Sequence, residues 1–188
     1  MPTAMNKKKE IALQTRKNLR EAFWNLYTEK PIEKITIKEV TDLAGYNRGT
    51  FYLYYKDIYD ILSVIEKEMI EIIEAFANRW MKEDIAEQWP YYVEELVAGI
   101  RLYARYASIL LSDHGDPAFT RELKRILRPA IERWAVTPKH LSEREAAVLT
   151  EYHLAGTISA LSAWLSQEEQ IPFQDFIGFM MKYFFPAL

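Results

Sequence analysis

The sequence predicts an all-α protein, and three observations lead to that prediction. Apolar residues recur with a period near 3.6 in several long segments, whereas strand-like alternation is scarce. The capping-box pattern Ser/Thr-x-x-Glu occurs at Thr36 with Glu39 and at Ser142 with Glu145. Glycine (6) and proline (8) are few for 188 residues, which disfavours a β-sandwich. We therefore expect helices arranged in one domain or two small ones.

Three helices are expected at the start of the chain, over 7–27, 36–43 and 48–54. Pro31 interrupts the chain after the first helix, and Gly45 stops the second. Thr36 and Asn47 are suitable N-caps for the two short helices. These helices are expected to share a small core, to which the sequence offers Ile11, Leu19, Ala22, Phe23, Leu26, Ile35, Ile37, Val40, Leu43 and Phe51.

The rest of the chain is also expected to be helical. A long helix opens at Lys56-Asp57, and its apolar stripe runs from Ile58 through Ile72 to Trp80. Asp116 can cap a later helix that Pro129 is expected to bend or interrupt. The predicted ranges are 56–82, 90–111, 117–135, 142–166 and 172–185.

Composition narrows the function classes. The chain has no cysteine, which excludes a disulfide scaffold, a thiolate metal site and a cysteine nucleophile. No apolar run approaches the roughly 18 residues of a membrane span, and the lysine-rich start lacks the apolar stretch of a signal peptide. A cytoplasmic protein with no membrane association is the expectation.

Charge is distributed unevenly along the chain. Residues 1–56 carry eleven Lys/Arg and six Asp/Glu, a net charge of +5, whereas residues 57–188 carry a net charge of −8. We call residues 1–56 the head and residues 57–188 the body. The positive charge of the head indicates that it binds a polyanion, whereas the acidic body does not. Ordinary scatter of charge is the competing interpretation.

The two short helices, 36–43 and 48–54, have the size and spacing of a helix-turn-helix. The second helix offers side chains that suit a DNA duplex. Arginine contacts guanine or phosphate, threonine contacts phosphate or a thymine methyl, and tyrosine hydroxyls contact phosphate. A helical hairpin of an enzyme would look similar.

The run from Ile35 to Asp57, ITIKEVTDLAGYNRGTFYLYYKD, resembles the signature of the TetR family of transcriptional regulators. The resemblance implies a three-helix DNA-binding head over 1–56 and a helical effector-binding and dimerisation body over 57–188. It also implies a homodimer on a pseudo-palindromic operator.

Carried over by position, the resemblance assigns DNA-binding roles. Thr36 and Lys56 would contact phosphate. The family usually has a lysine at the position of Ile58, so either Lys56 takes that role or the phosphate clamp is weaker. The recognition surface would consist of Asn47, Arg48, Gly49, Thr50, Tyr52 and Tyr54.

The body is rich in aromatic residues, which suits an apolar effector with a few polar anchors, or simply a packed core. The effector candidates are Tyr103, Tyr106, Trp134 and His153. Residues 109–119 resemble the C-terminal domain of a TetR subfamily that includes repressors and a coactivator of dihydroxyacetone-kinase genes. The basic stripe Arg121, Lys124, Arg125 and Arg128 is interpreted as a solvated helix face, with an anionic effector as the alternative.

The last two predicted helices suit a dimer surface. A stripe of small residues allows close helix approach, and the final helix is too apolar to face water alone. Burial within one chain is the alternative. The candidate interface residues are Gly156, Ser159, Ala160, Ala163, Phe176, Met180 and Tyr183.

Together these observations predict a TetR-like DNA-binding transcriptional regulator, a repressor that a small-molecule effector releases from its operator. The alternative is a TetR-like coactivator that acts through a protein partner. The sequence offers no catalytic constellation, no phosphate loop and no regular metal-ligand spacing, so neither an enzyme nor a cofactor is expected. The expected partners are a double-stranded DNA operator, a second copy of the chain and an unidentified small molecule.

Overall fold

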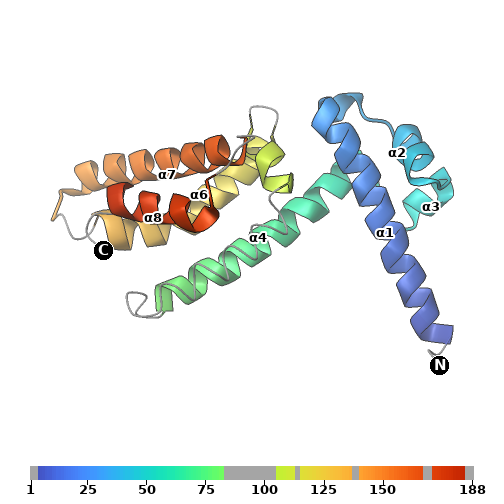
Figure 1. The fold of residues 1–188 in the computed structure, drawn as a ribbon, viewed down its shortest axis with the longest axis horizontal. Helices are drawn as coiled ribbons and strands as arrows, with labels where there is room; N and C mark the ends of the chain where they lie inside the picture. The colour runs from blue at the N-terminus through green and yellow to red at the C-terminus, as the bar shows by residue number, and fades with distance from the viewer. Residues whose placement is uncertain (1–3, 83–104, 113–114, 137–139, 167–170, 185–188) are drawn as a thin grey trace. The chain divides into compact units, whose positions relative to one another are not determined.

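The computed structural model describes residues 4–82, 105–112, 115–136, 140–166 and 171–184, and within these ranges the regular structure is helical with no strand (Figure 1). The chain divides into two compact units, Met1–Lys67 and Glu68–Leu188. The all-α prediction is confirmed.

The first unit contains α1 (Ala4–Glu29), a 3-10 turn η1 (Ile32–Lys34), α2 (Ile37–Ala44), α3 (Arg48–Tyr52) and the beginning of α4 (Ile58–Lys82). Its core joins α1 to the two short helices, because Phe23 and Trp24 of α1 are fully buried, as are Val40 of α2 and Phe51 of α3. Burying a side chain such as Phe51 stabilises the fold by roughly 2 kcal/mol.

Two apolar residues expected in this core lie at the surface instead. Ile11 is 57% exposed and Leu43 is 54% exposed. Burial along α1 begins at Thr15 among the residues whose side chains are described, so Ile11 lies on turns of α1 that precede its packed part. In α2 the buried residues are Val40 and Thr41, and a helix of only eight residues buries one narrow stripe that excludes Leu43.

The helix α4 continues without interruption through the boundary between the two units, which falls at Lys67–Glu68. Neither glycine nor proline occurs between Ile58 and Lys82, so nothing in the sequence breaks or kinks it. Its buried stripe includes Ile58, Ile61, Leu62, Ile65 and Met69. Ile72, which the sequence pattern assigns to the same stripe, is exposed.

The second unit contains the rest of α4, α6 (Pro117–Ile131), a π-helical turn η2 (Glu132–Val136), α7 (Glu143–Leu165) and α8 (Phe173–Phe184). Asp116 caps α6 and accepts a hydrogen bond from the Ala118 N–H (2.7 Å). The helix continues past Pro129 to Ile131 and then widens into η2, so the expected disturbance lies just after the proline. Of the helix expected over 90–111, only residues from 105 onward are described, and 105–110 are helical.

Two clusters of buried side chains hold α6, η2, α7 and α8 together. Ile131, Val136 and Leu154 form one cluster, and Trp164, Leu165, Phe176 and Met180 form the other. The rings of Trp164 and Phe176 stack with their centroids 5.3 Å apart. The indole N–H of Trp164 donates to the Ile171 carbonyl (2.9 Å), which fixes the chain as it enters α8.

Among the described residues, none of the helices is long and apolar enough to cross a bilayer.

Candidate nucleic-acid interface

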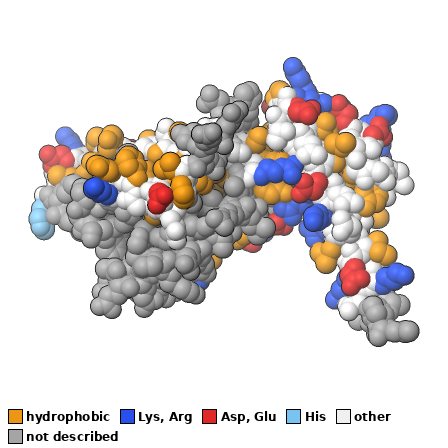
Figure 2. Space-filling view, viewed as in Figure 1, with side chains coloured by type: hydrophobic (Ala, Val, Ile, Leu, Met, Phe, Trp, Pro, Cys, Tyr) orange, Lys and Arg blue, Asp and Glu red, His pale blue; other side chains and the backbone are white. Residues whose placement is uncertain are grey.

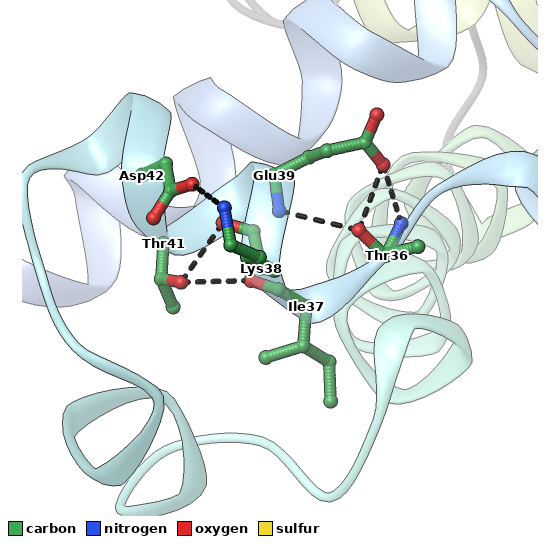
Figure 3. Close-up of polar contacts among 6 residues, drawn as sticks. All are labelled: Thr36, Ile37, Lys38, Glu39, Thr41 and Asp42. Carbon is green, nitrogen blue, oxygen red and sulfur yellow. Dashed lines mark hydrogen bonds and ion pairs between the residues drawn. The ribbon is translucent and has the colours of Figure 1, made fainter.

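The N-terminus of α2 is fixed by a complete capping box, as its sequence predicts (Figure 3). The Thr36 hydroxyl accepts from the Glu39 N–H (3.3 Å), while the Glu39 carboxylate accepts from the Thr36 N–H (2.9 Å). The same hydroxyl donates to the Glu39 carboxylate (2.8 Å). A phosphate contact by Thr36 therefore has to share or replace this last bond.

Lys30, which follows α1, ties the end of that helix to α2. Its Nζ lies 2.5 Å from Glu39 Oε1. The hydrogen bonds from Lys30 and from Thr36 lower the pKa of the Glu39 carboxyl to about 2. Glu39 is thus ionised at neutral pH and joins the cap of α2 to α1.

The turn after α2 depends on Gly45, whose φ of 75° lies in the left-handed region that glycine adopts readily. The Tyr46 N–H donates to the Thr41 carbonyl (2.9 Å), which completes the helix end. The Tyr46 hydroxyl accepts from Asn18 Nδ2 (3.1 Å). The turn between α2 and α3 is therefore attached to α1.

The helix α3 begins at its predicted cap, because the Asn47 carboxamide oxygen accepts from the Thr50 N–H (2.8 Å). Phe51 and, just beyond the helix, Tyr55 are buried and hold α3 on the core. Arg48, Gly49 and Tyr52 are exposed, whereas Thr50 and Tyr54 are half-buried. Five of the six predicted recognition residues thus lie on α3 or next to it with surface to offer, while the side-chain oxygen of the sixth, Asn47, serves as the cap.

Lys56 is exposed just before α4, and its backbone N–H donates to the Asp60 carboxylate (2.9 Å). Ile58, by contrast, is only 6% exposed and belongs to the core. Ile58 is thus a packing residue at the position where the resembling family usually has a lysine, and Lys56, two residues earlier, is exposed.

Sequence reasoning missed one residue of this surface, Leu53, which is the most exposed of the large hydrophobic side chains described. A helical wheel would have found it, because Phe51 and Tyr55 flank it at two residues on either side and face the core.

The predicted effector residues fall on several elements of the second unit. His153 is buried in α7, and Tyr106 is half-buried in the helix that includes residues 105–110. Trp134 lies in η2, although the position of its side chain is not described, and Tyr103 lies outside the described residues. Thr150 and Thr157 occupy the same face of α7 as His153, at i−3 and i+4.

The predicted interface residues divide between the interior and the surface of the second unit. Phe176 and Met180 are buried within the chain, and Gly156 and Ala160 are half-buried, with Ala160 packed on the Trp164 cluster. The exposed residues of the predicted set are Ser159, Ala163 and Tyr183.

Further exposed apolar residues extend this surface. Figure 2 shows hydrophobic side chains gathered over the part of the surface where Figure 1 places α7 and α8. Val148, Tyr152 and Ala155 continue the stripe along α7, and Phe179 accompanies Tyr183 on α8 with ring centroids 4.8 Å apart.

The basic stripe of α6 is largely neutralised by carboxylates. Arg125 pairs with Glu122 (2.7 Å) and with Glu74 of α4 (3.2 Å). These bonds raise the pKa of Arg125 and lower that of Glu122. Arg128 and Lys124 both pair with Glu151 of α7. Because three of the four cations in this stripe already pair with carboxylates, the stripe is better explained as a solvated helix face than as a binding site for an anionic effector.

Within the described ranges no group of three His, Asp or Glu side chains is placed to hold a metal ion. Residues 113 and 114 lie outside those ranges.

The α2–turn–α3 arrangement is that of a helix-turn-helix, and the fold is similar to solved structures of TetR-type regulators. A crystal structure of a TetR transcriptional regulator from Streptococcus agalactiae 2603V superposes with a TM-score of 0.64 at 21% identity, covering 96% of this chain and 98% of that one. The dihydroxyacetone kinase operon activator DhaS superposes with a TM-score of 0.53 at 17% identity, covering 89% of this chain and 94% of that one.

A sequence relative points the same way. The chain is 36% identical over 65 residues to the uncharacterized HTH-type transcriptional regulator YxbF of Bacillus subtilis strain 168, a match to 32% of this chain. It spans only 17% of the length of that relative. No family model matches the sequence. The chain thus shares its fold with TetR-family transcriptional regulators.

Proposed function

We propose that this chain is a DNA-binding transcriptional regulator of the TetR type, with a DNA-binding head at residues 1–56 and an effector-binding and dimerisation body at 57–188. One observation carries the proposal: Phe51 and Tyr55 anchor α3 to the core while Arg48 and Tyr52 stay exposed. A short helix fixed in this way presents a rigid surface to the major groove of DNA.

In the proposed complex the two α3 helices of a homodimer enter successive major grooves, about 34–36 Å apart on one face of the duplex. Arg48 reads a base or a phosphate, while Thr36 and Lys56 hold phosphates. Asn47, Gly49, Thr50, Tyr52 and Tyr54 complete the surface. Phosphate contacts supply much of the affinity and make it fall steeply with salt.

The second copy covers the exposed apolar surface of α7 and α8. Val148, Tyr152, Ala155, Ser159 and Ala163 follow one face of α7 at intervals of three or four residues. Phe179 and Tyr183 add the apolar surface of α8. Two such helix pairs related by a twofold axis form a four-helix bundle and remove these side chains from water.

The effector is proposed to bind in the body, near Tyr103, Tyr106, Trp134 and His153. The Thr157 hydroxyl oxygen supports a polar anchor there, because it is buried and has no hydrogen-bond partner within the described part of the chain. The proposed action is release of a repressor from its operator. An effector achieves this only if it binds the released conformation more tightly than the DNA-bound one.

A coactivator acting through a protein partner is the second candidate. It is favoured by the fold similarity to the activator DhaS and by the resemblance of residues 109–119 to the subfamily described above. In that case the head anchors the complex on DNA and the body receives the partner.

The test is a salt titration of binding to the chain's own promoter DNA, with a scrambled duplex of equal composition as control. Selective, salt-sensitive binding with two chains per site is expected. Equal, weak binding to both duplexes would reject autonomous operator binding and place the coactivator first.

A further inference from the structure

The exposed surface of α3 has an apolar apex at Leu53, whose side chain is 78% exposed. The backbone of Leu53 remains helical (φ −71°, ψ −21°), so the helical path continues to this residue. At about 100° per residue, Leu53 lies roughly 160–200° around the helix from Phe51 and Tyr55. Since both of those side chains are buried, Leu53 points directly away from the core.

Gly49 and Thr50 share this face with Leu53, one helical turn earlier. Gly49 carries no side chain, and a Cβ built there would lie 3.1 Å from Asn47 Oδ1. The Thr50 hydroxyl donates to the same Asn47 oxygen (3.3 Å), which leaves the Thr50 methyl for apolar contact. The three residues thus lie on one face of α3, the face turned away from Phe51.

Charged and polar side chains accompany Leu53 on the exposed surface of the head, and such groups suit a DNA groove. Arg48, Tyr52 and Lys56 are exposed and can contact phosphates or polar base edges. Leucine can neither donate nor accept a hydrogen bond, so in a groove it gains only by covering an apolar group. The C5-methyl of thymine is the apolar feature that base pairs present in the major groove.

We propose that Leu53, together with Gly49 and Thr50, is a specificity determinant that reads a thymine methyl group at one fixed position of each operator half-site. The inference rests on the proposed function and adds the base that the apex of α3 selects. A cytosine at that position has a hydrogen in place of the C5-methyl, so the leucine loses its apolar contact, and the neighbouring N4 amine gains no hydrogen bond from the leucine.

The experiment begins with duplexes that the wild-type protein selects from a random pool. Each thymine of the selected site is then replaced in turn by deoxyuridine, which removes only the methyl group. In each half-site, the replacement at one thymine position is expected to weaken wild-type binding about fourfold, which is the change in affinity that corresponds to one buried methyl group. Replacements at the other thymines are expected to have little effect. Leu53→Ala is expected to bind the thymine and deoxyuridine sites equally.

Leu13→Ala is the matched control, because it truncates an exposed leucine of the same head on α1. It is expected to keep the wild-type response to deoxyuridine. Melting temperatures check that both variants fold. Should Leu53→Ala fail to fold, Leu53→Asn and the wild-type deoxyuridine series still decide the question.

Two results would overturn the inference while leaving the proposed function intact. One is selective wild-type binding that no thymine replacement weakens, and the other is a Leu53 variant that keeps the full thymine preference. Wild-type protein that selects no sequence from the pool would reject the proposed function and the role of Leu53 with it.

Discussion

Asn47 and Arg48 are adjacent in sequence, but the Asn47 side chain caps α3 whereas the Arg48 side chain is exposed. The Asn47 side-chain oxygen accepts hydrogen bonds from the N–H and the hydroxyl of Thr50, so it holds the start of α3. Arg48 is exposed on the first turn of the same helix. A guanidinium in that place can form two hydrogen bonds to a guanine edge or pair with a phosphate.

Replacing Arg48 by alanine distinguishes these two roles. If Arg48 reads a base, Arg48→Ala is expected to cost about 1–3 kcal/mol of binding free energy and to relax the preference at one position. Anisotropy titrations against the selected site and its single-base variants measure both quantities. A loss that is equal on every duplex would make Arg48 a phosphate contact.

Tyr52 tests the polar part of the same surface, because its hydroxyl can be removed without changing the ring. Tyr52 is exposed, so Tyr52→Phe is expected to leave the melting temperature unchanged and to weaken operator binding. Unchanged affinity would remove the hydroxyl from the interface. The same titration and a thermal melt provide the two readouts.

Glu39 gives the head a predictable pH dependence. Its pKa in the folded protein is about 2, below the ordinary value of 4.5, because Lys30 and Thr36 bond to the carboxylate. A group whose pKa is lowered by folding contributes stability above its unfolded pKa and loses it as pH falls through the folded value. The contribution is therefore complete at pH 7 and decays below about pH 5.

Glu39→Gln is expected to melt at a lower temperature than wild type at pH 7, with the difference shrinking between about pH 5 and pH 2. Melting curves at several pH values measure this. Asp42→Asn is the matched control, because Asp42 pairs with Lys38 within α2 and not with α1. A difference that stays constant down to pH 2 would mean that the Glu39 charge does not stabilise the head.

At the scale of the elements, α7 and α8 each have one buried and one exposed apolar side. The buried sides meet in the Trp164 and Phe176 stack. Exposed apolar groups such as Tyr152 and Phe179 remain on the other side, where a second copy can cover them.

Placing a carboxylate on each exposed side tests this. Tyr152→Glu with Phe179→Glu is expected to weaken dimerisation at least ~100-fold, because an unpaired carboxylate buried in an interface costs several kcal/mol. Sedimentation equilibrium measures the association. Leu13→Glu, at an exposed position of α1, is the control, and a dimer that persists in the double variant would place the interface elsewhere.

The starts of four helices could be predicted from local sequence, because an N-cap acts within four residues. Thr36, Asn47, Asp116 and Ser142 all cap the helices that the sequence assigns to them. Which apolar residues are buried depends on distant partners, and periodicity alone does not reveal them. Ile11 and Leu43 have suitable spacing yet lie at the surface.

The candidate site shows the same division. The positions of Arg48 and Tyr52 follow from the short helix and its anchor Phe51, which the sequence contains. The burial of Ile58 agrees with the apolar stripe that the period near 3.6 predicts for α4. Buried polar groups such as Thr157 depend on the whole second unit.

At the scale of the whole molecule, a twofold dimer doubles every contact of the head. Lys56→Gln then removes two phosphate contacts from each complex. The slope of log K against log salt is expected to become shallower by about 1.8, since each contact contributes about 0.9. Titrations at four or more salt concentrations give the slope, and Lys38→Gln, where the lysine already pairs with Asp42, is the control.

An unchanged slope in Lys56→Gln would show that Lys56 does not hold phosphate. In that case, the burial of Ile58 would leave this end of the head without the cationic contact proposed here.

The unbroken course of α4 has a geometric consequence. Its 25 residues make a rod about 37 Å long, and no glycine or proline softens it. If one end of such a rod tilts by about 5°, the other end travels about 3 Å. That distance is close to the rise of one base pair along a strand, about 3.4 Å. In the proposed regulator, a tilt of this size along α4 would shift a DNA-binding head by about one base pair.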